Sequence, residues 1–257
     1  MVVDLDAAVQ SVNAFTWPFL RTSALLYAAP VFGNRTLPAT VRVLLAVFVA
    51  LLVAPLVPAP PAVDPLTFAG LVIGAQQLVI GLAMGFVLTM VFSVLAQAGE
   101  QVALGMGLGF ASINDPSNGL TVPVVSQYYV IVGTLVFLGL GGHVLIIETL
   151  ARSFVTLPVG LDGLDADVFY RIALWGAQMF AAAVLLALPA VASLLVVNLA
   201  FGVVTRAAPQ LNIFAVGFPI MILVGIGAML FTLPALTDQL ADVLAAAFGF
   251  LGRMIGA

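Results

Sequence analysis

The sequence predicts an all-α, polytopic membrane protein of the inner-membrane type. Hydrophobic residues make up 63% of the 257 residues and charged residues only 7%, whereas soluble domains carry about 25% charged residues. The apolar runs are long and continuous, unlike the alternating pattern of about ten residues that is typical of membrane β-strands. A chain of this length accommodates about six spans of roughly 20 residues each.

Composition also excludes several classes of function. The chain has no cysteine and one histidine, so thiol chemistry is absent and a histidine-rich metal site is not expected. The net charge of −4 argues against a nucleic-acid partner. The acidic N-terminus lacks the basic region of a secretory signal, so we expect the first apolar segment to stay in the mature protein.

The apolar runs can be followed in order along the chain. They cover about residues 7–32, 43–57, 67–99, 121–147, 172–201 and 213–236. The second run ends in the proline-rich segment 55–61, which cannot continue a helix. The third run is uncharged and longer than the roughly 20 residues that a bilayer needs. We therefore expect tilt, a kink or a hairpin in it.

The later runs contain residues that break or bend helices. Gly139, Gly141 and Gly142 predict a break or a close helix contact near the end of the fourth run. Pro189 and Pro219 remove backbone hydrogen bonds, which is tolerated at membrane depth only where neighbouring protein satisfies the freed groups. We expect both prolines to kink helices that pack against other helices.

The chain ends in a stretch with a different pattern. Between residues 236 and 255, leucines and other apolar residues recur at helical spacing, with Asp238 and Asp242 one turn apart on the other face. This pattern predicts an amphipathic C-terminal helix.

The first stretch with chemical interest contains Arg21, which interrupts an apolar run. Its charge must find a carboxylate, a carbonyl or water. The alternative is an arginine at a helix end that extends its head group to the membrane interface. Arg35 and Arg42 are interpreted as ordinary loop arginines.

The second stretch, residues 99–119, is the most informative. Gly105, Gly107 and Gly109 alternate and a turn-rich segment follows, so a plain helix is not expected. Irregular apolar backbone is allowed at membrane depth only inside protein or along a cavity. A re-entrant loop that lines or blocks a pore fits, and a surface loop with a few apolar side chains is the alternative. The candidate plug residues are Gly105, Met106, Gly107, Leu108, Gly109, Phe110, Ala111, Ser112, Ile113, Asn114, Asp115 and Pro116.

Other charged residues have simpler interpretations. Glu100 is either a gate or ion-relay carboxylate or a helix-end charge, and Glu148 and Arg152 have the spacing of a helix ion pair. The third stretch, residues 198–219, predicts a tight helical hairpin around Arg206, which joins Arg21 and Glu100 as a gate or ion-pair candidate. No nucleophile has a base beside it and no phosphate-binding loop is present, so we expect neither an enzyme nor a cofactor.

Together the three stretches resemble the FliR family of flagellar type III secretion export-gate subunits. The resemblance is carried by Arg21, residues 29–38, Arg42, 99–100, 109–111, 115–116, Gly119, Asn198, Gly202, 206–214 and 217–219. It covers nearly the whole chain, and the third motif is the most specific because a long string of mixed polarity rarely matches by chance.

The resemblance implies an architecture and partners. It implies a FliP-like helical unit over residues 1–170, with a plug loop at about 99–120, and a FliQ-like hairpin over residues 171–257. One copy would join five FliP-like and four FliQ-like subunits in a helical cone, with a FlhB-like neighbour. This cone would surround a channel for unfolded flagellar proteins. The alternatives are an injectisome homologue or a small-solute transporter that uses Glu100, Glu148 and Arg21.

Overall fold

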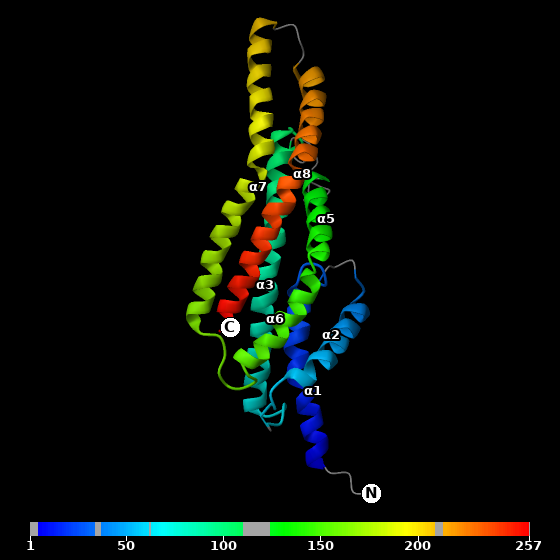
Figure 1. The fold of residues 1–257 in the computed structure, drawn as a ribbon, viewed down its shortest axis with the longest axis vertical. Coiled ribbons are helices and arrows are strands. Elements are labelled where there is room, and N and C mark those ends of the chain that lie inside the picture. Colours follow the sequence, from blue (N-terminus) through cyan, green and yellow to red (C-terminus); the bar gives the residue numbers. More distant parts are fainter. Residues whose placement is uncertain (1–4, 34–36, 62, 110–123, 209–212, 257) are drawn as a thin grey trace. The chain divides into compact units, whose positions relative to one another are not determined.

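The computed structural model describes residues 5–33, 37–61, 63–109, 124–208 and 213–256. Within these residues the chain is helical and has no strand, which confirms the predicted all-α class (Figure 1). The elements in order are α1 (Leu5–Ala28), α2 (Ala39–Val53), the 3-10 turn η1 (Ala54–Leu56), α3 (Phe68–Gly105), α5 (Val124–Gly139), α6 (Gly142–Thr156), α7 (Ala166–Ala207) and α8 (Ile213–Met254).

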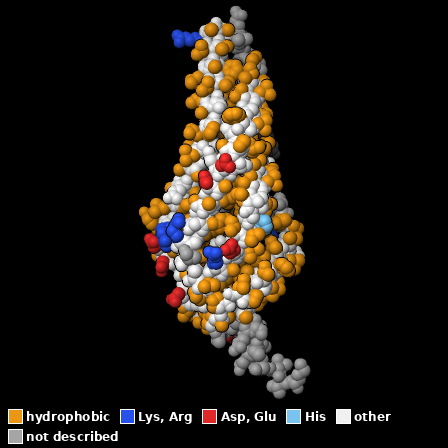
Figure 2. Space-filling model, in the orientation of Figure 1, with side chains coloured by type: hydrophobic (Ala, Val, Ile, Leu, Met, Phe, Trp, Pro, Cys, Tyr) orange, Lys and Arg blue, Asp and Glu red, His pale blue; other side chains and the backbone are white. Residues whose placement is uncertain are grey.

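Four segments of the described chain are long and apolar enough to cross a membrane, which confirms a multi-pass protein. These are Ala39–Leu56, Phe68–Gly105, Ala166–Ala207 and Val216–Met254. Figure 2 shows hydrophobic side chains over most of the visible face and only sparse charged ones. Because large apolar side chains such as Phe48 and Leu44 are more than 60% exposed, lipid or partner subunits must cover them.

Several local expectations are confirmed and two need correction. α2 ends at Val53, beside the predicted proline stop, and the fourth run breaks between α5 and α6, where Gly141 has φ of 74°. The third run is one helix of 38 residues, so the hairpin considered for it is wrong. The sixth run and the amphipathic stretch form the single helix α8, and Pro234 lies inside it.

The chain forms two compact units that are interleaved in sequence. Unit 1 comprises Met1–Met90, Gly141–Trp175 and Ala245–Ala257, and unit 2 comprises Val91–Leu140 and Gly176–Leu244. Helices α3, α7 and α8 contribute residues to both units. The division expected near residue 170 concerns the kinship of segments rather than their compactness, so it stays a prediction.

In unit 1, α1 and the first part of α3 pack at close range through small residues. A Cβ atom on Gly81 would lie 2.8 Å from Cβ of Ala24, and one on Gly85 would lie 2.5 Å from Cβ of Ala28. One turn further, the hydroxyl of Thr89 donates a hydrogen bond of 2.5 Å to the carbonyl of Ala28. The contacts advance together along both helices, so α1 and α3 run parallel, with the small-xxx-small pattern of close membrane-helix pairs.

In unit 2, the second part of α3 packs antiparallel to α5. A Cβ atom on Gly99 would lie 2.5 Å from Cα of Ser126, and the rings of Phe92 and Phe137 meet edge to face at 5.6 Å. As the residue number rises along α3, the residue that it contacts on α5 has a lower number, so the two helices run in opposite directions. The end of α3, where the second sequence stretch begins, is therefore held by α5.

The predicted face of the C-terminal amphipathic stretch is present within unit 2. Leu236, Leu240 and Leu244 are at most 5% exposed, whereas Asp238 and Asp242 are exposed. The alternation follows helical spacing, as the sequence predicts.

Candidate functional site

Arg21 forms a fully buried polar centre in unit 1. Its Nε and Nη2 donate to Oε1 of Gln77 at 2.9 and 2.6 Å. Nη1 donates to the carbonyl and hydroxyl oxygens of Ser153 at 2.7 and 3.1 Å. Nη2 also donates to the carbonyl oxygen of Leu157 at 2.9 Å. These bonds account for the five N–H donors of a guanidinium group.

The environment of Arg21 compensates its charge without a carboxylate. The acceptors given for it in the described chain are neutral, and the guanidinium carbon lies 4.1 Å from the ring centroid of Phe154. Ser153 and Leu157 lie at the C-terminal end of α6, where carbonyl groups carry partial negative charge. Arg21 is 0% exposed, so the alternative of an arginine that reaches the membrane interface is wrong.

Gln77 is a residue of this centre that the sequence analysis did not single out. Its side chain is 0% exposed within α3, and its amide oxygen accepts two bonds from one arginine. A signal was available, because an amide inside a long uncharged run needs a polar partner. The sequence could not show that this partner is Arg21.

The second sequence stretch begins in unit 2 with a segment that we call the stem, residues 105–109. Gly105 ends α3, and Gly107 has φ of 83°, a conformation that favours glycine. Between them, Met106 is only 2% exposed. Its side chain lies against Gly225 of α8, because a Cβ atom there would be 2.6 Å from Cγ of Met106. The stem is therefore packed against protein.

Two cavities flank Met106 in unit 2. One, of about 370 Å³, is lined by the stem, by Asn198, Phe201 and Gly202 of α7, and by α8 residues that include Phe218. The other, of about 340 Å³, is lined by Met106 and by residues of α5 and α8. The structure thus brings the second and third sequence stretches together, and Met106 lines both cavities.

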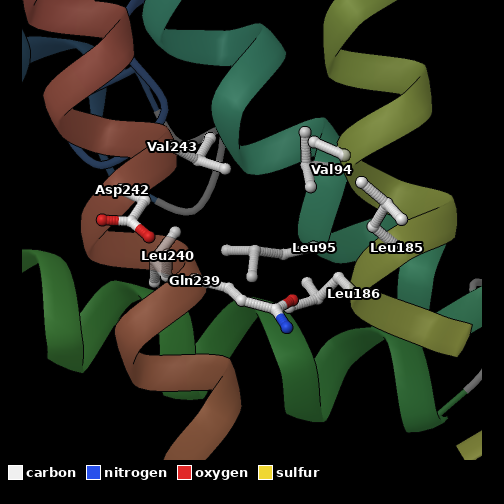
Figure 3. Close-up of a pocket in the computed structure, with 9 residues that line it drawn as sticks. Val94, Leu95, Leu185, Leu186, Gln239, Leu240, Asp242 and Val243 are labelled. Carbon is white, nitrogen blue, oxygen red and sulfur yellow. The ribbon is translucent and has the colours of Figure 1, made fainter. Parts of the chain in front are cut away.

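A third cavity of unit 2 has a different character. It has a volume of about 350 Å³ and lies between α3, α7 and α8, where Leu95, Leu240 and Gln239 converge and Asp242 lies at the edge (Figure 3). In the described chain, no cluster of histidine, aspartate and glutamate could hold a metal ion. The cavity is largely apolar, and its polar side chains are those of Gln239 and Asp242.

The remaining predicted site residues are dispersed or lie outside the described residues. Of the candidate plug residues, 110–116 lie outside them. Glu100 and Arg206 are exposed, and neither enters a salt bridge within the residues that the structure covers. Glu148 and Arg152 form the predicted helix pair at 2.7 Å.

The two prolines proposed as kinks lie within helices. Pro189 is inside α7 and Pro219 is inside α8. Both helices continue through their prolines, and the kinks themselves stay predictions.

Comparison with known proteins gives one consistent family. Residues 12–247 match the model of "Bacterial export proteins, family 1". The chain is 36% identical over 243 residues to the flagellar biosynthetic protein FliR of Escherichia coli (strain K12), covering 95% of this chain and 93% of that protein. It is 38% identical over 247 residues to FliR of Pectobacterium carotovorum subsp. carotovorum, covering 92% and 94%. FliR of Aquifex aeolicus (strain VF5) is 34% identical, with 87% and 86% covered.

Matches of this length leave little of the chain outside the family pattern, and the apolar helices agree with it. The chain therefore belongs to the FliR family of bacterial export proteins and is a multi-pass inner-membrane component of the flagellar export apparatus.

Proposed function

We propose that the chain forms part of the wall of the flagellar export channel and supplies its plug, which an arriving unfolded flagellar protein displaces. The observation that carries this proposal is the stem. Met106 is buried and Gly107 has a positive φ, so irregular apolar backbone packs inside protein as a pore-blocking loop requires. A surface loop with incidental apolar residues would leave Met106 in solvent.

The proposed gate closes by excluding water. Apolar side chains at a constriction block small ions because a narrow apolar passage loses its water. Gly107, which follows Met106, has φ of 83°, a backbone conformation that a residue with a side chain adopts only with strain. The mechanism is passive in this subunit, and the energy for export comes from other components.

The proposed assembly contains one copy of this chain with five FliP-like and four FliQ-like subunits and a FlhB-like neighbour. Exposed apolar side chains on α2, α7 and α8 support extensive partner or lipid contacts. The relatives described above carry flagellar names, which favours the flagellar over the injectisome apparatus. Native mass measurement after gentle detergent extraction tests the stoichiometry, and a chain recovered as a monomer or homo-oligomer contradicts it.

A small-solute transporter is the weaker alternative. Its binding site would need Arg21, Glu148 and Glu100 to converge near the middle of broken helices. Instead, neutral groups satisfy Arg21, and Glu148 is half-exposed and paired with Arg152. Uptake of a solute by the purified single chain in liposomes would support this alternative and remove the proposed one.

The plug is tested by removing it in the assembled apparatus. We expect deletion of residues 105–110, or Gly107→Val, to change both the small-ion leak of the membrane and the amount of flagellar protein secreted. Gly227→Val is the matched control, because a Cβ atom at Gly227 has no neighbour within 4 Å. Co-purification with the partner subunits verifies assembly. Unchanged leak and unchanged export in an assembled deletion variant would show that the plug assignment is wrong.

A further inference from the structure

We propose that Met106 and Gly225 form a steric latch that holds the stem, residues 105–109, against α8 in the closed arrangement. The inference rests on the proposed plug function and adds to it the contact that must break before the plug moves. Met106 acts as a positioning residue, and Gly225 provides the notch that receives its thioether.

The geometry shows a notch rather than a chance contact. A Cβ atom on Gly225 would lie 2.1 Å from Cε, 2.6 Å from Cγ and 2.9 Å from Sδ of Met106. These three atoms span most of the Met106 side chain. Even a methyl group at position 225 would therefore displace more than the flexible end of Met106. Glycine at position 225 is therefore required by the position of Met106.

The surroundings make release of the latch possible. Met106 lines both flanking cavities, of about 370 and 340 Å³. Methionine is unbranched and has three rotatable bonds, so it adapts to irregular spaces. The two cavities provide unfilled space beside the thioether, into which it moves when it leaves the notch.

The neighbouring glycines do not share this feature. A Cβ atom on Gly105 would lie 3.0 Å from Cδ1 of Leu194, and one on Gly107 would lie 3.6 Å from the ring of Phe218. One on Gly109 would lie 2.6 Å from Cδ2 of Leu104, but this atom is the flexible end of the side chain and Cγ of Leu104 is 3.9 Å away. On α8, two residues beyond Gly225, Gly227 faces open space. The steric conflict is thus concentrated on the pair of Met106 and Gly225, and Gly227 supplies a control on the same helix.

The experiment uses the full chain in the assembled export apparatus of cells that lack another copy. We expect Gly225→Ala to raise the small-ion leak roughly tenfold, which corresponds to about 1.4 kcal/mol and lies within the usual cost of overpacking. Met106→Ala alone also raises the leak. The double variant lowers it again, because the new methyl group fills the vacated space. Gly227→Ala leaves the leak unchanged.

A second pair of variants keeps the test decisive if Gly225→Ala fails to assemble. The chain has no cysteine, so Met106→Cys with Gly225→Cys introduces one possible intramolecular disulfide. Cγ of Met106 lies 2.6 Å from a Cβ atom at position 225 and one C–C bond of about 1.5 Å from its own Cβ, so the two Cβ atoms are at most about 4 Å apart, no farther than a disulfide allows. We expect it to form, to block export and to release export on reduction.

The outcomes separate the latch from the plug. If deletion of residues 105–110 changes the leak but Gly225→Ala behaves like Gly227→Ala, the latch is wrong and the plug stands. A double variant that leaks as much as both single variants combined also overturns the latch, as does failure of the disulfide to form. If the deletion itself has no effect, the proposed function fails first.

Discussion

The substitution Gln77→Leu is expected to be among the most destabilising single changes in unit 1. It removes the acceptor of two hydrogen bonds from Arg21, at 2.9 and 2.6 Å, while the guanidinium stays buried. Hydrogen bonds to charged groups contribute about 1.5–3 kcal/mol each. Removing a partner from a charge that stays buried costs about 3–5 kcal/mol of stability. We expect a loss of about 3–5 kcal/mol in the free energy of unfolding.

The loss can be measured as a shift of the melting temperature. For a chain of this size, 1 kcal/mol corresponds to roughly 2–4 °C, so the melting temperature should fall by roughly 6–20 °C. Thermal unfolding of the detergent-solubilised full chain can be followed by tryptophan fluorescence, because Trp17 and Trp175 are both buried. Arg152→Gln is the control. Arg152 and its partner Glu148 are each at least half-exposed, so we expect this substitution to lower the free energy of unfolding by at most about 1 kcal/mol.

A double substitution tests the cause. Arg21→Met with Gln77→Leu removes the buried charge and its main acceptor together, and apolar replacement of a buried polar pair is often close to neutral. The double variant should therefore lose clearly less free energy of unfolding than the two single variants lose in sum. The reasoning is refuted if Gln77→Leu shifts the melting temperature no more than the control, or if the two single costs simply add.

Two further predictions concern glycines and use the same unfolding measurement. Gly81→Val places a Cβ atom 2.3 Å from the carbonyl oxygen of Arg21, so it should cost at least about 1–3 kcal/mol, whereas Gly74→Ala meets nothing closer than 3.4 Å and should be tolerated. Equal effects at these positions would contradict the close approach of α1 and α3. Gly141→Ala should cost about 1–2 kcal/mol because φ is 74°, while Gly139→Ala, at an open helical position, should be neutral or stabilising. The reverse order would show that the break does not depend on the left-handed conformation.

Features encoded by nearby residues were predictable from the sequence. Proline at position 55 stops α2 because it cannot continue the backbone hydrogen bonds, and Gly141 permits the left-handed turn before α6. Glu148 and Arg152 pair because one helical turn separates them. Each of these depends on spacing within a few residues, which the sequence displays directly.

The partners of Arg21 were not predictable in this way. Gln77 lies 56 residues from it and Ser153 lies 132 residues from it. The sequence shows that a charge in an apolar run needs acceptors, but it does not show which of the distant polar groups folding brings near. The notch at Gly225 carried no signal at all, since a glycine in an apolar helix also occurs where nothing approaches, as at Gly227.

Hydropathy, the strongest signal in the sequence, also cannot identify what covers each helix. The most apolar windows of Ala39–Leu56 and Phe68–Gly105 have nearly equal mean hydropathy, 2.4 and 2.5, yet 22% of the first and 56% of the second are buried within the chain. The difference arises because glycines of α3 admit α1 on one part of its length and α5 on another. A helix that is apolar all round must be covered, and neighbouring helices, lipid and partner subunits all satisfy that requirement. In α3 the close contacts lie at Gly81 and Gly85 towards α1 and at Gly99 towards α5, and mean hydropathy does not reveal them.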